Sequence, residues 1–134
     1  MVEQDKWAIF EAASTPEDES YQEHMASFVN SFVLKARRDR WLYQLAKRPK
    51  RIRGDSHKIY GDLDRTKCSL VKDESSLSKL RGEGIYYEFF DEPKFLSVQN
   101  ALFIGPRHDA ISSLVAGKVA IFFFHEDEIW LCQT

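Results

Sequence analysis

The sequence predicts an α+β fold in which N-terminal helices pack on a C-terminal antiparallel sheet of about three or four strands. Apolar residues recur at helical spacing over 21–32, and beyond Gly84 the chain changes to short runs of aromatic and β-branched residues. The length of 134 residues is typical of one domain and sufficient for one core. We therefore expect a single globular domain over 1–134, helical over about 1–82 and sheet-forming over about 84–134.

Helical patterns dominate the first half of the chain. Thr15 and Pro16 are suited to the N-cap and the first position of a long helix, because the hydroxyl accepts a bond from a free amide and proline has no amide to leave unpaired. This helix either curves on to about Lys47 or breaks near Arg37 and restarts, and Pro49 ends it. Shorter helical turns are expected at 3–13, 57–63 and 77–80, with a polar loop at 64–76.

The second half of the chain is predicted to form strands joined by short turns. The runs 85–90 and 129–132 are rich in aromatic and β-branched residues. The run 119–124 is almost unbroken in its apolar character, which is typical of a strand buried on both faces. Residues 110–116 alternate moderately and predict a strand, with a helix capped by Asp109 as the alternative. The connections are a turn at 91–94, a short helix from Ser97 to Leu102 and a hairpin turn at 116–117.

Eight large apolar side chains are expected to share one core. The stripe that begins at Tyr21 and Met25 repeats every three or four residues, as one face of a helix does. A second stripe consists of Leu34, Trp41 and Leu45. In the predicted strands, alternate residues face the same side. The predicted core consists of Phe28, Phe32, Trp41, Leu45, Phe89, Ile121, Phe123 and Leu131.

The composition excludes several classes of protein. With 43% hydrophobic and 30% charged residues, the chain resembles ordinary globular domains. The apolar runs are all far shorter than the roughly 18–20 residues of a membrane span, and the N-terminus lacks the features of a secretory signal. We expect a soluble, cytoplasmic protein in which Cys68 and Cys132 are reduced thiols, with no structural disulfide, no required metal and no cofactor.

The charges are distributed unevenly along the chain. The net charge is −2, but residues 35–53, the basic segment, hold nine basic residues and one acidic residue, a net charge of +8 that leaves −10 elsewhere. Such polarity favours a basic face that attracts an anionic partner, and a merely solvated face is the alternative. The residues predicted to bind a partner are Arg37, Arg38, Arg40, Lys47, Arg48, Lys50 and Arg51.

Two aromatic residues interrupt the basic segment. Trp41 and Tyr43 could stack on unpaired bases while the cations neutralise phosphates, although Trp41 also lies on the predicted core stripe. Residues 47–53 fit the loose pattern of a nuclear import signal as well. An isoelectric point near 6.1 argues against general nucleic-acid binding.

The sequence contains no recognisable catalytic motif. Its six glycines form no phosphate-binding loop, and it has no Gly-x-Ser-x-Gly nucleophile elbow. Cys68 follows Arg65 and Lys67, cations that favour a thiolate, but no base can be assigned to it. His108 and His125 lie near acidic residues and are possible zinc ligands, yet a solvated turn is the simpler interpretation of His125 and its neighbours.

These patterns favour a small non-enzymatic protein that binds another macromolecule. A stoichiometric inhibitor or a bacterial immunity-type protein fits this description, and an acidic protein is the expected partner. A nucleic-acid-binding accessory protein that uses the basic segment is the alternative hypothesis. A metal- or thiol-dependent enzyme is the third.

Overall fold

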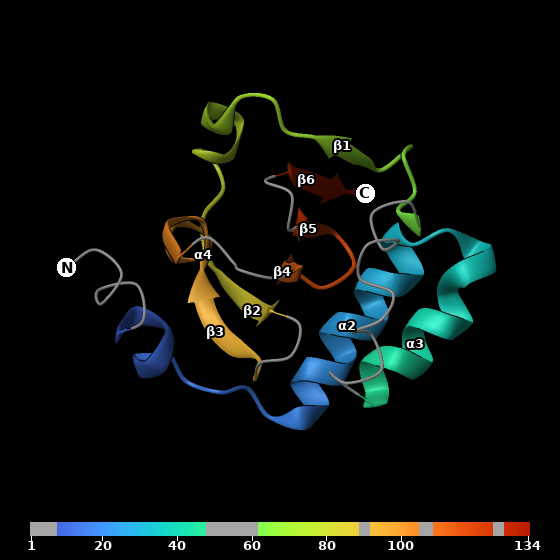
Figure 1. Cartoon of the computed structure of the whole chain (residues 1–134), viewed down its shortest axis with the longest axis horizontal. Helices are drawn as coiled ribbons and strands as arrows, with labels where there is room; N and C mark the ends of the chain where they lie inside the picture. Colours follow the sequence, from blue (N-terminus) through green and yellow to red (C-terminus); the bar gives the residue numbers. More distant parts are fainter. Residues whose placement is uncertain (1–7, 48–61, 89–91, 105–108, 125–127) are drawn as a thin grey trace.

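The computed structural model describes residues 8–47, 62–88, 92–104, 109–124 and 128–134. After a helical turn at 8–12, the elements are α2 (Asp18–Phe32), η1 (Lys35–Arg37), α3 (Arg38–Lys47), β1 (Cys68–Leu70), η3 (Glu74–Leu77), β2 (Glu83–Glu88), β3 (Lys94–Ser97), α4 (Val98–Ile104), β4 (Ala110–Val115), β5 (Val119–Phe124) and β6 (Glu128–Gln133). The described strands form one antiparallel sheet in the order β1-β6-β5-β4-β2-β3 (Figure 1). The chain therefore has an α+β fold.

The sheet has six strands rather than the three or four that the sequence predicts. Strands β2, β4, β5 and β6 coincide with predicted strands, and residues 110–115 are strand rather than helix. The sequence pattern misses β1, inside a predicted polar loop, and β3, beside a predicted turn. Both are edge strands of three and four residues, too short to display an alternating pattern. The predicted division at Gly84 is also wrong, because β1 lies in the half expected to be helical.

The predicted apolar stripe forms the buried face of α2. A break and restart is the alternative that the structure confirms, but the break lies at Val33, which forms an isolated β-bridge with Leu63. The carbonyl oxygen of Asp62 accepts the N–H of Leu34 at 2.8 Å, and the chain turns through η1 into α3. Leu34 is exposed and does not join the predicted second stripe. The buried residues of α2 are Tyr21, Met25, Phe28, Val29 and Phe32.

The N-cap of α2 lies two residues later than predicted. Glu17, rather than Thr15, occupies the N-cap position, and its side chain makes no capping hydrogen bond. The preceding segment is attached to β3 instead, because the carbonyl oxygen of Ser14 accepts the N–H of Phe95 at 2.8 Å. This long-range contact keeps the chain extended through Pro16, which is buried, and delays the start of the helix.

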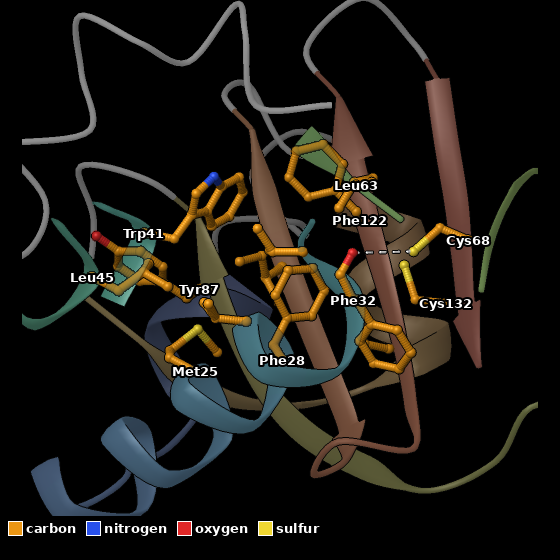
Figure 2. Packing of buried hydrophobic residues seen from close by; sticks show 14 of the residues in the cluster. Met25, Phe28, Phe32, Trp41, Leu45, Leu63, Cys68, Tyr87, Phe122 and Cys132 are labelled. Atoms are coloured by element: carbon orange, nitrogen blue, oxygen red, sulfur yellow. Dashed lines mark hydrogen bonds between the residues drawn. The ribbon is translucent and has the colours of Figure 1, made fainter. Parts of the chain in front are cut away.

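The core is divided between the two faces of the sheet. The first cluster joins α2 and α3 to one face, and it includes Ala120, Phe122 and Phe124 of β5. Figure 2 shows Phe122 beside Phe32 and Leu63 in this cluster. The second cluster joins the turn at 8–12 and α4 to the other face, and it includes Ile121 and Phe123. Successive residues of a strand point to opposite faces, so β5 serves both clusters.

The prediction of a single core is therefore wrong, although most of the predicted residues are buried. Phe28, Phe32, Trp41 and Leu45 belong to the first cluster. Ile121, Phe123 and the partly buried Leu131 belong to the second, and Phe89 lies outside the described residues.

Candidate interaction surface

The inner side of α3 is fixed to α2 by an aromatic contact and a hydrogen bond, and to Asp62 by a second hydrogen bond. The ring of Trp41 packs against Phe28, with 6.3 Å between ring centroids, and its Nε1–H donates to Oδ2 of Asp62 at 3.0 Å. The hydroxyl of Tyr21 donates to the carbonyl oxygen of Leu45 at 3.2 Å. These contacts hold α3 in one rotational position, and they determine which of its side chains face outward.

The outer side of η1 and α3 presents exposed cations and an exposed aromatic ring. The side chain of Arg37 is 57% exposed and Tyr43 is 56% exposed. Arg40 and Tyr43 are three residues apart and lie on one side of α3, and Arg37 precedes them in η1. Nε of Arg37 lies 3.7 Å from Oδ1 of Asp62, an exposed ion pair that contributes little stability. We call Lys35, Arg37, Arg40 and Tyr43 the α3 surface.

The seven residues predicted to bind a partner have different surroundings. Arg37 and Arg40 are exposed on the α3 surface. Arg38 is half-buried, and its Nε–H donates to the carbonyl oxygen of Val33 at 2.9 Å, so it closes the end of α2. Lys47 is the last residue of α3. Arg48, Lys50 and Arg51 lie outside the described residues.

The two aromatic residues of the basic segment have opposite environments. Trp41 is only 4% exposed and belongs to the first core cluster, so its ring is not a platform for bases. Tyr43 projects from the outer side of α3 and is accessible to a partner. Exposed aromatic rings beside arginine are common at binding surfaces, because both side chains contribute large contact areas.

The structure corrects the expected environment of Cys68. It is buried in β1 and lies opposite Cys132 of β6, rather than in a polar loop. Arg65, one of the two cations that were expected to favour a Cys68 thiolate, packs on Trp130, with its guanidinium 4.5 Å from the ring centroid. A hydrogen bond with Cys68, together with burial, raises the pKa of the Cys132 thiol far above its ordinary value. A raised pKa disfavours the thiolate, which is the nucleophilic form of cysteine.

The described residues contain neither a metal-binding cluster nor a membrane span. No three of their His, Cys, Asp and Glu side chains are grouped so that they could hold a metal ion. His108 and His125, the possible ligands in the sequence, lie outside the described residues. None of the described helices is long and apolar enough to cross a membrane.

No protein-family model, curated protein or solved structure matches this chain. The α3 surface is the strongest candidate, because its cations are exposed and its helix is held firmly by buried contacts on the opposite side.

The structure also reveals a polar contact that the sequence interpretation misses. His24 is half-buried between α2 and the sheet, where its Nδ1 lies 2.8 Å from Oγ of Ser113 in β4. Burial lowers the pKa of His24, while Glu23 and the bond to Ser113 act in the opposite direction. The signal was present in the helical spacing, because His24 follows the buried Tyr21 by three residues and therefore lies beside the apolar stripe.

Proposed function

We propose that this protein binds an acidic macromolecule through the α3 surface and acts by stoichiometric binding rather than by catalysis. An inhibitor or an immunity-type protein that covers a negatively charged site on its target would work in this way. The exposure of Arg40 on the firmly held helix α3, and of Arg37 in the preceding turn η1, is the observation that supports this proposal. The two reduced thiols suit the cytoplasm as the place of action.

Charge complementarity is the physical basis of the proposal. The basic segment has a net charge of +8 within a chain whose remaining residues carry −10. An acidic partner is attracted to the basic residues and repelled by the acidic ones, which orients the two proteins before contact. The partner's acidic side chains would pair with Arg37 and Arg40, and Tyr43 would add a contact of large area.

A nucleic acid is the second candidate partner, and the exposed ring of Tyr43 favours it. Tyr43 lies one helical turn from Arg40, so a base stacked on the ring would bring its phosphate towards a cation. The isoelectric point near 6.1 and the negative charge of the remaining chain favour the protein partner.

The proposal can be tested by capture from native host cells with two charge-reversed variants. Arg37→Glu with Arg40→Glu reverses the α3 surface. Lys72→Glu with Lys79→Glu produces the same change in net charge at two exposed lysines around η3, away from α3 in Figure 1. Each variant and the parent chain are used as bait, with and without nuclease, and circular dichroism verifies the fold of both variants.

Three results distinguish the hypotheses. A protein retained by the parent and by the η3 variant after nuclease treatment, but lost by the α3 variant, supports the proposal. Loss of every partner after nuclease treatment supports nucleic-acid binding. A partner retained equally by both variants contradicts a role for the α3 surface.

A further inference from the structure

The two cysteines of the chain occupy directly opposed positions on neighbouring strands. In the register of β1 and β6, Cys68 pairs with Cys132. The N–H of Gln133 donates to the carbonyl oxygen of Lys67 at 3.0 Å, while the N–H of Cys68 donates to Asp64 rather than to Cys132. The first bond lies beside the cysteine pair, and the second shows that the N–H of Cys68 does not bond to Cys132. The pair therefore occupies a non-hydrogen-bonded site of the ladder. Opposed residues at such sites have Cα atoms about 4.5 Å apart, the closest approach in an antiparallel sheet.

The side chains of this pair also lie on the same face of the sheet. Both cysteines are buried in the first core cluster. The Sγ–H of Cys68 donates to the carbonyl oxygen of Phe32 at 3.8 Å, and a hydrogen bond links the two thiols. Figure 2 shows the two sulfur atoms turned towards each other. A disulfide requires Cα atoms about 4.4–6.8 Å apart, and the register of the two strands satisfies this requirement.

We propose that Cys68 and Cys132 form a reversible disulfide when the protein meets a low-molecular-weight disulfide such as oxidised glutathione. One protein thiol, as the thiolate, attacks a sulfur of the oxidant, which forms a mixed disulfide and releases one small thiol. The second protein thiolate then attacks the protein sulfur of this mixed disulfide and releases the second small thiol. The protein loses two electrons and two protons, and the oxidant gains both.

Access to the buried thiols requires a local opening of the sheet edge. β1 has three residues and, among the described strands, pairs only with β6, so it can separate without unfolding of the central strands. Opening also restores water to the thiols and thereby favours the reactive thiolate. The reaction is therefore slow and limited by opening, and closure of the edge brings the two sulfurs together for the second step.

The disulfide can be detected directly, because the chain has only these two cysteines. The reduced full-length protein is incubated with oxidised glutathione in native buffer, then denatured and treated with an alkylating reagent. Intact mass spectrometry should show the loss of two alkylation sites with no added glutathione and no dimer. Reduction should restore both sites, and the oxidised protein should have a higher urea midpoint than the reduced protein.

A shifted pair provides the matched control. Cys68→Ala with Ser69→Cys keeps two thiols but moves one to the neighbouring position, which points to the opposite face of the sheet. This variant should acquire bound glutathione or form dimers instead of an internal link. The proposal is overturned if the parent protein remains fully reduced under native conditions, if it forms only mixed disulfides or dimers, or if its internal link lowers the urea midpoint.

Discussion

At the scale of single residues, Trp41 both packs in the core and donates a hydrogen bond, as buried tryptophans commonly do. Its ring fills the first core cluster beside Phe28, while its Nε1–H reaches the carboxylate of Asp62. The same aspartate lies near Arg37, and its carbonyl oxygen accepts the N–H of Leu34. Trp41 and Asp62 therefore connect the buried side of α3 to the start of that helix.

We expect Trp41→Phe to lower the free energy of unfolding by about 1–3 kcal/mol, because it removes a hydrogen bond to a carboxylate and leaves a smaller ring in the core. Asp62→Asn is the milder variant, since the amide oxygen can still accept the bond. Urea denaturation measures both changes. An unchanged free energy for Trp41→Phe would show that the bond to Asp62 does not stabilise the protein.

Two nearby glycines should differ sharply in their tolerance of a methyl group. At Gly84 an added Cβ would lie 2.2 Å from the carbonyl oxygen of Ser113, a backbone atom that cannot move aside alone. At Gly82 the space is open, but φ is +104°, a conformation that side chains disfavour. We expect Gly82→Ala to cost about 1–2 kcal/mol. Gly84→Ala should cost about 3 kcal/mol or more.

Thermal unfolding of the two alanine variants measures which substitution destabilises the protein more. If Gly84→Ala melts at or above the temperature of Gly82→Ala, β2 and β4 are not packed as closely as the structure describes.

Side chains in regular patterns could be predicted from the sequence, whereas those placed by long-range pairing could not. Phe28 and Trp41 follow a helical period, and both are buried as expected. Cys68 lies among polar residues and is buried because β1 pairs with β6, the last strand of the chain. Nothing in the local sequence around Cys68 indicates that pairing.

At the scale of elements, β5 forms the middle layer between two separate clusters. Phe32 lies in the first cluster and Phe123 in the second. We expect Phe32→Ala and Phe123→Ala each to lower the free energy of unfolding by about 3–5 kcal/mol, because each leaves a cavity. Phe103→Ala, at a ring that is 45% exposed, should cost far less, and thermal or urea unfolding measures all three.

The separation of the two clusters predicts additivity. The milder changes Phe32→Leu and Phe123→Leu, when combined, should add to within about 0.5 kcal/mol, since distant sites rarely interact. Strong coupling in the double variant would favour the single core that the sequence pattern suggests.

The contact between α2 and β4 should make stability depend on pH. Burial holds the pKa of His24 below its ordinary value of 6.5, so the unfolded chain binds the proton first as the pH falls. Stability should be highest above about pH 6.5 and should decrease as the pH falls from there towards the lower folded-state pKa. Urea midpoints measured across this range should fall less steeply for His24→Gln, and equal slopes would contradict this assignment.

The accuracy of the predicted elements follows their length and their dependence on distant contacts. α2 was predictable because its apolar residues recur at helical spacing over 15 residues, and β5 because its 6 residues form an almost unbroken apolar run. The start of α2 was not, because the hydrogen bond between Ser14 and Phe95 holds the preceding chain extended. The candidate site also has a predictable and an unpredictable part. The charge of the basic segment is visible in the sequence, but the capping role of Arg38 depends on the break at Val33.

At the scale of the whole molecule, the packing of the core determines which charged side chains face the solvent. Trp41 and Leu45 hold α3 by its inner side, and Arg40 on that helix and Arg37 in the preceding η1 remain exposed. Long-range attraction between such a surface and an acidic partner mainly raises the association rate, and salt screens it over about 8–10 Å. Surface charges of this kind contribute little to folding stability.

The most direct test measures association rates with the captured acidic partner across a range of salt concentrations. Arg37→Glu with Arg40→Glu should lower the association rate by about tenfold or more at low salt and reduce its salt dependence, because steering of this strength is typical of charged surfaces. The control, Lys72→Glu with Lys79→Glu, has the same net charge and should associate nearly as fast as the parent protein. Equal rates and salt dependences for the two variants would contradict the proposed role of the α3 surface.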